Sequence, residues 1–420
     1  MVGLVFHFDT HPRINEQDAL AVHAFVYRWD GVAYHRNFSG TGGCVRIFYA
    51  TDSLCQQLSC FPLAWVVRSI RPITLNAYSP MHTRRQFLHQ LGLATAGLGL
   101  FNQLPVQGMA GSATKPLNFD ISMAEFSFAG DLFSGKMTNL DFASRTKKEF
   151  GVNVLEYVSM FFDNKHTDSA YLKDLKQRSD DLGMKNHLIM VDGANIADLD
   201  ATKRQQAVTA HFTWVDAAKY LGCSAIRVNL GDSNRALSGA ADDPADEAAK
   251  AAADGYHKLL EYAAKQQLNV IVENHFGNST NVDWLIGVLK QVNMPNAGLL
   301  PDFGNFCAQR SNPATADIKG ALSTTCVREY NRYEGVKKMM PYAKGISAKT
   351  HKFDAKGNET ETDFRRIFQI IKDAGFSGYV GIEYEGGIIG MYKPDAGYPS
   401  TVDGIKATKA LLEKTRAELV

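Results

Sequence analysis

The sequence VIVENH at residues 270–275 is the first of four segments in which a strand-like apolar run ends in metal-binding side chains. The others are LLPDFGNF (299–306), ISAKTHKFD (346–354) and VGIEYEG (380–386). Three of the four contribute a carboxylate, from Glu273, Asp302 and Glu383. Carboxylates that converge repel one another and are costly to desolvate unless a cation neutralises them. The four segments therefore predict a divalent-metal site at the mouth of a barrel.

The chain from residue 119 onward alternates strand-like and helix-like segments with short connections. We expect eight strands, at residues 119–128, 152–159, 185–192, 225–232, 269–276, 297–306, 344–353 and 379–385. Segments with a helical period lie between them, at residues 170–182, 206–221, 247–267, 282–292 and 363–374. Eight such units over about 300 residues predict an α/β fold, the (β/α)8 TIM barrel. A doubly wound open sheet is disfavoured because no glycine-rich phosphate loop follows the first strand.

The strand period sorts the polar candidates, because side chains two residues apart on a strand point the same way. The pairs are Glu273 with His275, Lys349 with His351, Glu383 with Glu385, and Arg227 with Asn229. The carboxyl ends of barrel strands meet at one mouth, so these residues can surround one small ligand. Glu156, at the end of the second expected strand, joins them there.

Residues 81–113 resemble a twin-arginine export signal. Arg84 and Arg85 precede an apolar run at 91–100, and small residues follow around Ala110. Such a signal is an address read by the twin-arginine translocase, and its apolar run is too short to anchor the chain stably in a membrane. We therefore expect a periplasmic protein that meets the translocase during export.

An export signal at this place divides the chain into three parts. Residues 1–80 lack a sustained helix or strand period, so we expect an upstream extension outside the mature protein, with a genuine small domain as the alternative. Residues 114–420 then form the barrel. They contain Cys223, Cys307 and Cys326, an odd number without CxxC spacing, which predicts neither a disulfide framework nor a structural zinc site.

The composition argues against one class of partner. The chain has 420 residues, 45% of them hydrophobic, and a formal net charge of +1. This apolar content is ample for a large core, and a near-neutral chain has no long-range attraction to a phosphate backbone. We therefore expect no nucleic-acid partner. The sequence leaves the existence of a homo-oligomer open.

The last four strand-like segments resemble the xylose isomerase-like barrel superfamily of sugar and sugar phosphate isomerases and epimerases. The resemblance covers roughly residues 117–390. In that superfamily Glu, Asp, His and Glu at the ends of strands five to eight hold one divalent ion. The resemblance thus implies Glu273, Asp302, His351 and Glu383 as the metal ligands.

The chain departs from the superfamily pattern at two of these segments. Asn305 stands where epimerase relatives often have a histidine three residues after the aspartate. A second alignment of the seventh strand, to relatives with His-x-Lys, places Lys349 on the lysine and leaves Ser347 where the ligand should be. His351 is therefore the ligand that depends on the choice of alignment.

The resemblance implies proton abstraction next to the carbonyl of a small carbohydrate. An oxygen-dominated ligand set suits Mn²⁺ first and Mg²⁺ or Co²⁺ next, with Zn²⁺ less suited. Candidate bases are His275 and Glu156, and Lys349 is a candidate acid or a cation near the developing oxyanion. Glu273 and Glu383 are assigned to the catalytic set as well as to the metal.

Two other functions remain open at this stage. The order Glu273, Asn274, His275 also resembles barrel subunits that cleave 3-keto-glycosides by elimination, which would make the protein a metal-dependent lyase or hydratase. A non-catalytic periplasmic sugar-binding protein is the second alternative. Four aromatic residues could stack on a sugar, although core packing is the more frequent role of such residues: Trp284, Phe303, Phe306 and Tyr384.

Overall fold

The structure is a computed structural model of the 420-residue chain. It describes residues 117–419 except 232–243, 276, 316 and 317, together with four short strands nearer the N-terminus. The chain divides into two compact units, Met1–Val106 and Gln107–Val420. The proposed export signal at residues 81–113 lies outside the described residues. None of the described helices has the length and apolar character needed to cross a membrane.

The first unit contains two antiparallel strand pairs. Strand β1 (Leu4–His7) pairs with β2 (His23–Val26), and β3 (Cys44–Tyr49) pairs with β4 (Gln56–Pro62). The second unit holds all the residues that were expected to carry chemistry.

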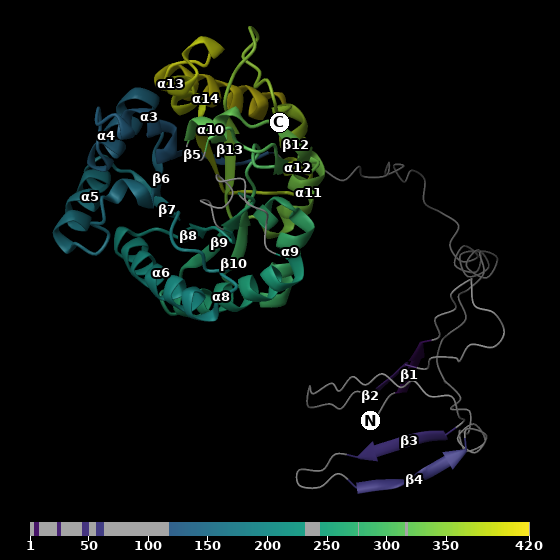
Figure 1. Cartoon of the computed structure of the whole chain (residues 1–420). Coiled ribbons are helices and arrows are strands. Elements are labelled where there is room, and N and C mark those ends of the chain that lie inside the picture. The colour runs from purple at the N-terminus through teal and green to yellow at the C-terminus, as the bar shows by residue number, and fades with distance from the viewer. Residues whose placement is uncertain are drawn as a thin grey trace, which may run out of the picture. The chain divides into compact units, whose positions relative to one another are not determined.

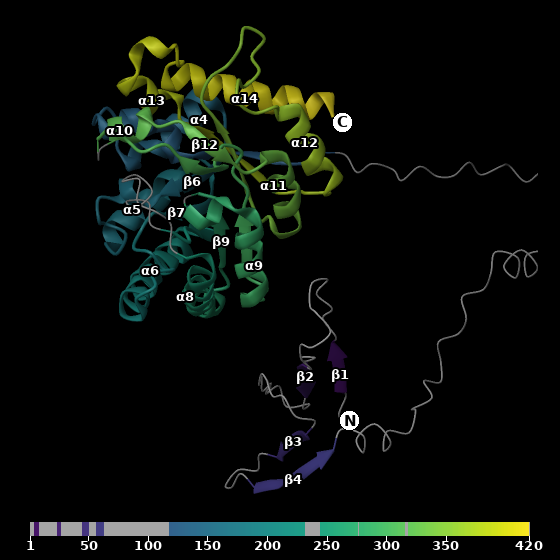
Figure 2. The same ribbon diagram turned by 45° about the vertical axis from the view of Figure 1, so that its right-hand side comes forward.

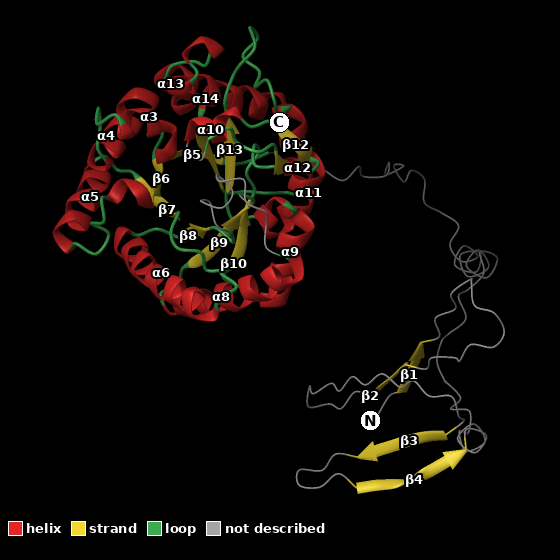
Figure 3. Ribbon diagram, in the orientation of Figure 1, coloured by secondary structure: helices red, strands yellow, loops and turns green. Residues whose placement is uncertain are grey.

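The second unit is built on eight parallel strands, as the sequence predicts. They are β5 (Asp120–Ala124), β6 (Val154–Val158), β7 (Lys185–Val191), β8 (Ala225–Val228), β9 (Asn269–Glu273), β10 (Ala297–Leu300), β13 (Ile346–Thr350) and β14 (Tyr379–Tyr384). Their order in the sheet is β10-β9-β8-β7-β6-β5-β14-β13. Two isolated parallel bridges, Leu299 to Ala343 and Asp302 to Ser347, join the two ends of this order. The sheet is therefore a nearly closed barrel, with the helices as an outer ring (Figures 1 and 3).

The described part of the ring contains the five helices expected from the sequence and six others. They are α3 (Ala129–Phe133), α4 (Phe142–Phe150), α5 (Ser169–Asp181), α6 (Ala201–Leu221), α8 (Ala245–Lys265), α9 (Val282–Val292), α10 (Ile318–Ser323), α11 (Arg332–Met339), α12 (Phe364–Asp373), α13 (Gly386–Tyr392) and α14 (Thr401–Glu418). Helix α6 shows why the boundaries are sharp: the Asp200 side chain accepts hydrogen bonds from the first turn, and Gly222 ends the helix with a φ of 80°. The last helix, α14, packs against β14 and α12 (Figure 2).

Two apolar clusters hold the barrel together. The larger one lies between the strands and the helices, and it contains Phe303, Phe306 and Tyr384. These three aromatic side chains are at most 1% exposed, so they serve as core rather than as a sugar-stacking surface. The smaller cluster gathers seven residues from six strands of the barrel: Ala124, Val158, Leu188, Met190, Ala225, Ile271 and Leu300. It joins the strands among which the polar site is built.

An insertion between β10 and β13 contradicts one prediction from the sequence. Strand β11 (Cys307–Arg310) pairs antiparallel with β12 (Cys326–Glu329), and a disulfide links Cys307 to Cys326. Cys223 is the free cysteine of the described residues, and it is buried. The odd number of cysteines therefore reflects one bridge and one core residue. The hairpin starts a few residues after Asp302, so the disulfide fixes a loop that follows directly from the candidate site.

Candidate active site

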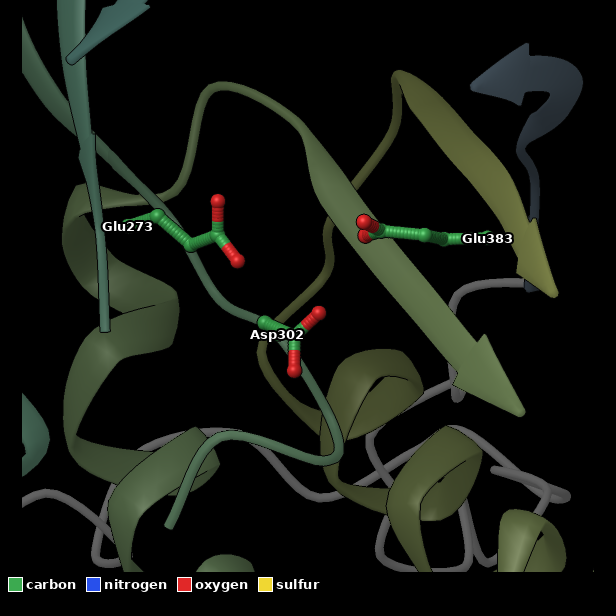
Figure 4. Close-up of side chains that lie close together, drawn as sticks. All are labelled: Glu273, Asp302 and Glu383. Atoms are coloured by element: carbon green, nitrogen blue, oxygen red, sulfur yellow. The ribbon is translucent and has the colours of Figure 1, made fainter. Parts of the chain in front are cut away.

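Three buried carboxylates meet at the carboxyl ends of the barrel strands. Glu273 is the last residue of β9, Asp302 follows β10, and Glu383 lies near the end of β14. One oxygen of each carboxylate lies within 4.8 Å of the others. The three residues are between 0% and 5% exposed. Figure 4 shows their carboxylates pointing toward one another.

Glu273 is held by a cation and an amide. The Nε of Arg227, from β8, lies 3.0 Å from Oε2 of Glu273. Asn305 donates a hydrogen bond of 2.8 Å from Nδ2 to Oε1 of the same carboxylate. Burial raises the pKa of Glu273 well above its ordinary value, although Arg227 opposes the rise. Arg227 also pairs at 2.5 Å with Asp192, just after β7, and this pair fixes the position of the guanidinium.

Asp302 is held by its own turn. Its Oδ1 accepts hydrogen bonds from the backbone N–H groups of Gly304, at 2.7 Å, and Asn305, at 2.9 Å. The side chain of Asn274 forms two hydrogen bonds with the backbone of Asp302: its Oδ1 accepts from the N–H, and its Nδ2 donates to the carbonyl. The carboxylate of Asp302 therefore has a fixed direction before any ligand binds.

Ser347, on β13, lies between the second and third carboxylates. Its hydroxyl donates to Oδ2 of Asp302 at 2.8 Å and also contacts Oε2 of Glu383. Burial and the repulsion of Asp302 and Glu385 raise the pKa of Glu383 to about 7, against the attraction of Lys349. The hydroxyl is thus part of the cluster, and its role was visible in the sequence only through the second alignment.

Lys349 brings a buried cation to the same cluster. Its Nζ lies 3.0 Å from Glu385, 3.6 Å from Asp302 and 3.9 Å from Glu383. Burial alone would lower the pKa of Lys349, but these carboxylates raise it well above the ordinary value. A Cβ added at Gly304 would lie 2.8 Å from the lysine side chain, so a glycine there leaves room for it. Lys349 is therefore a charged group beside the carboxylates in the mouth of the barrel.

The structure does not bring His351 to the three carboxylates. Strand β13 ends at Thr350, and the histidine ring beyond it lies between two other acids. Its Nε2 is 3.4 Å from Glu385 and its Nδ1 is 3.4 Å from Glu361. Burial opposes protonation, but these two partners raise the pKa of His351 to about 10. A protonated imidazole has no lone pair for a metal, so in this geometry His351 is an ion-paired residue and Ser347 takes the place beside the acids.

Glu156 extends from β6 across the inside of the barrel. Its Oε1 accepts a hydrogen bond of 2.5 Å from Ser122 on β5. Within the described residues its Oε2 has no hydrogen-bond partner, and the side chain is buried. Burial, with a smaller effect from Glu383, raises the pKa of Glu156 to about 7, against the Ser122 hydrogen bond and Arg227. A Cβ at Gly381 would lie 2.6 Å from Oε2, so the absence of a side chain on β14 makes room for this carboxyl.

His275 lies two residues beyond the end of β9. Its backbone N–H donates to the hydroxyl of Ser279 at 3.1 Å. Burial, together with the positive charges of Arg227 and Lys349, lowers the pKa of His275 to about 3. The imidazole is therefore neutral at pH 7 and can accept a proton. Lys349, the predicted cation, is therefore close enough to affect the pKa of this predicted base.

The donor chemistry of this cluster fits a hard divalent cation. Glu273, Asp302 and Glu383 offer carboxylate oxygens, which suit Mg²⁺ and Mn²⁺, and the Ser347 hydroxyl is a further oxygen. When all three acids are ionised, Arg227 and Lys349 do not neutralise them, because Arg227 also pairs with Asp192 and Lys349 with Glu385. These three carboxylates are thus the residues that would hold a cation.

The chain belongs to the xylose isomerase-like TIM barrel family, whose pattern matches residues 146–408. Among curated proteins, none matches the chain significantly in sequence.

Solved structures with the same architecture include an L-ribulose 3-epimerase, at 12% identity and a TM-score of 0.52, which covers 71% of this chain and 95% of its own. The IOLI protein with a bound zinc atom is 14% identical with a TM-score of 0.50, over 72% of this chain and 99% of its own. A family member from Mycobacterium smegmatis in complex with magnesium is 15% identical with a TM-score of 0.50, over 72% and 98%. Likenesses at this level of identity establish the shared fold.

Proposed function

We propose that the protein is a divalent-cation-dependent isomerase or epimerase of a small carbohydrate. The observation that supports this function most directly is the buried group of Glu273, Asp302 and Glu383 at the barrel mouth, with a neutral imidazole and a charged lysine beside it. Titratable groups whose surroundings separate their pKa values are typical of sites that move protons. The family and the names of the similar structures agree with carbohydrate chemistry.

Glu273, Asp302 and Glu383 are the proposed cation ligands, with Mn²⁺ preferred, Mg²⁺ or Co²⁺ next and Zn²⁺ last. When bound, such a cation would polarise the carbonyl group of a sugar and stabilise negative charge on its oxygen. Arg227 and Asn305 keep Glu273 directed toward the cluster, and the turn that follows Asp302 does the same for the second ligand.

The proposed reaction begins with removal of the proton on the carbon next to the carbonyl. His275 is neutral, and Glu156, with a pKa of about 7, is partly ionised near neutral pH, so Glu156 is the stronger base of the two candidates. The electron pair left behind moves into the carbonyl group to give an enediolate, whose oxygen charge the ammonium of Lys349 would stabilise. Return of the proton to the opposite face gives an epimer, and its return to the neighbouring carbon gives an isomer.

A lyase or hydratase acting on 3-keto-glycosides is the second candidate function. One observation favours it: the neutral imidazole of His275 lies two residues beyond the proposed cation ligand Glu273, just past the end of β9. The first step is the same proton removal. The electron pair then forms a carbon–carbon double bond and expels the aglycone oxygen from the β-carbon. The departing oxygen takes up a proton.

We further propose that the protein acts in the periplasm after twin-arginine export. The disulfide between Cys307 and Cys326 supports an oxidising compartment, where such bonds form and persist. Replacement of Arg84 and Arg85 by lysine should retain the protein in the cytoplasm, which cell fractionation would measure. Equal periplasmic amounts of variant and wild type would refute the twin-arginine route, and wild-type protein found in the cytoplasmic fraction would refute the location.

The function is tested by proton NMR in D₂O with the full chain loaded with Mn²⁺ or Mg²⁺ and a panel of ketoses, aldoses and 3-keto-glycosides. Deuterium at a sugar carbon together with an isomeric product supports the isomerase or epimerase, and a released aglycone supports the lyase. Glu273→Gln should abolish both, whereas Glu247→Gln, on the exposed first turn of α8, should change neither. Tight sugar binding without exchange would favour the binding protein, and full activity after chelation would refute the cation-dependent mechanism.

A further inference from the structure

The cluster of three carboxylates contains a hydroxyl at the position where a second alignment expects an imidazole. Ser347 is on the inner face of β13, and its Oγ donates to Asp302 at 2.8 Å and contacts Glu383. Among the described residues, no histidine or cysteine joins Glu273, Asp302 and Glu383 within the same 4.8 Å. The cluster therefore offers oxygen atoms alone.

The backbone fixes Ser347 in this place. Ser347 forms a parallel bridge with Asp302, its N–H donates to the carbonyl of Pro301 at 3.0 Å, and its carbonyl accepts from Phe303 at 3.2 Å. Ser347 is thus hydrogen-bonded to the residue before Asp302 and to the residue after it. These contacts fix the register of the strand, so β13 cannot shift to bring His351 into the cluster. The position of the hydroxyl is thus a property of the barrel closure.

His351 also has other partners. Its two ring nitrogens are each 3.4 Å from a carboxylate, that of Glu361 or of Glu385. Moving the ring to the cluster would leave Glu385 with Lys349 as its remaining ion-pair partner. Breaking a largely buried ion pair in this way is unfavourable.

The choice of donor atoms determines which cation is preferred. Carboxylate and hydroxyl oxygens suit hard ions such as Mg²⁺ and Mn²⁺, whereas imidazole and thiolate ligands favour zinc. Lys349 and Arg227 lie beside the carboxylates and reduce their net charge, which weakens binding of every cation without changing the preference.

We propose that the donor atom at position 347 decides the metal preference of this barrel: with serine there, the centre has oxygen ligands alone, takes Mn²⁺ or Mg²⁺, and lacks the zinc affinity that an imidazole or thiolate at this position would add. This inference rests on the proposed function for the presence of a cation at Glu273, Asp302 and Glu383. It concerns the identity of the ion and does not depend on which sugar reacts.

The test compares Ser347→Cys with Ser347→Ala in the full chain, stripped of metal and titrated with Mn²⁺ and Zn²⁺ by calorimetry. Cysteine is close to serine in size, so this variant adds a soft ligand with little steric change, and alanine is its matched control. We expect Ser347→Cys to raise the ratio of Zn²⁺ to Mn²⁺ affinity by at least about tenfold, while Ser347→Ala leaves that ratio unchanged within about threefold. Co²⁺ added to the cysteine variant should show a thiolate charge-transfer band, which the wild type and the alanine variant should lack.

An unchanged affinity ratio and no charge-transfer band in Ser347→Cys would overturn the inference. So would a strong zinc preference of the wild type that His351→Ala abolishes, since an imidazole would then be the ligand. Absence of any cation binding to the wild type would overturn both this inference and the cation in the proposed function. If the Zn²⁺ to Mn²⁺ affinity ratios are as expected but no sugar exchanges a proton in the NMR assay, the proposed function is refuted and the assignment of Ser347 stands.

Discussion

Replacing Glu156 by Gln should change how the stability of the protein depends on pH. Burial raises the pKa of Glu156 from 4.5 to about 7. Between these values the folded protein keeps a proton that the unfolded chain has lost, so the free energy of unfolding falls as the pH rises. A rise of this size corresponds to about 3 kcal/mol, at about 1.4 kcal/mol for each unit.

Glutamine does not titrate and closely matches the protonated carboxyl in shape. The Ser122 hydroxyl can still donate to the amide oxygen of Gln at this position. The stability of Glu156→Gln relative to wild type should therefore increase by about 2 to 3 kcal/mol from pH 5 to pH 8.5. Urea unfolding at several pH values measures this difference, and other titrating groups largely cancel between the two proteins.

The exposed residue Glu247 provides a matched control, because Glu247→Gln should give a curve parallel to that of wild type. A difference between Glu156→Gln and wild type that is constant within about 0.5 kcal/mol over the same range would refute the argument, since it would mean that burial does not hold a proton on Glu156.

Three further predictions follow from the same geometry. Glu383→Gln should lower Mn²⁺ affinity and turnover together by more than about 100-fold, measured by calorimetry and by the exchange assay; loss of one without the other would separate Glu383 from the cation. Because the pKa of Glu383 is about 7, cation binding below this pH should release a proton, and the cation affinity should rise with pH. Calorimetry in buffers of different ionisation enthalpy measures the released proton. A cation affinity that is constant from pH 6 to 8 would contradict this prediction. Gly381→Ala should destabilise the fold by about 1 to 3 kcal/mol, because its Cβ would lie 2.6 Å from Glu156, and Glu156→Ala should relieve most of that loss; additive losses in the double variant would rule out the clash.

The barrel could be predicted from the sequence because its strands and helices carry strong local patterns. Eight apolar runs alternate with helical periods, and each expected strand is present with shorter ends. The ends were overextended where the chain turns before the apolar pattern stops. After β10, for example, Pro301 ends the regular strand, and the N–H groups of Gly304 and Asn305 then turn to the Asp302 side chain.

The triad of carboxylates was predictable for the same reason, since Glu273, Asp302 and Glu383 each follow or end a strand. The partners of these acids were harder to identify. Arg227 was placed on the inner face by the strand period, but its pairing with Glu273 depends on the register of β8 and β9, in which Arg227 lies opposite Ile271. Asn305 reaches Glu273 through the turn after Asp302.

His351 and the cysteines show what a single sequence does not contain. The strand period assigns Lys349 and His351 to the same face, but β13 ends at Thr350, and beyond that residue the ring is directed by Glu361 and Glu385. The bridge between Cys307 and Cys326 depends on the register of a hairpin without a recognisable turn motif. Long-range contacts decide both outcomes, and local patterns do not record them.

The seam between β10 and β13 links the closure of the barrel to the geometry of the site. In the described structure these two strands meet through isolated bridges, and one of the bridges joins Asp302 to Ser347. The same backbone contacts therefore close the barrel and space the aspartate from the hydroxyl. If β10 and β13 separate, Asp302 and Ser347 therefore move apart at the same time. A cation bound at Asp302 and Glu383 would stabilise the barrel at this seam, where the strands are joined by isolated bridges. Cation binding should therefore slow the hydrogen exchange of the Ser347 and Phe303 amides.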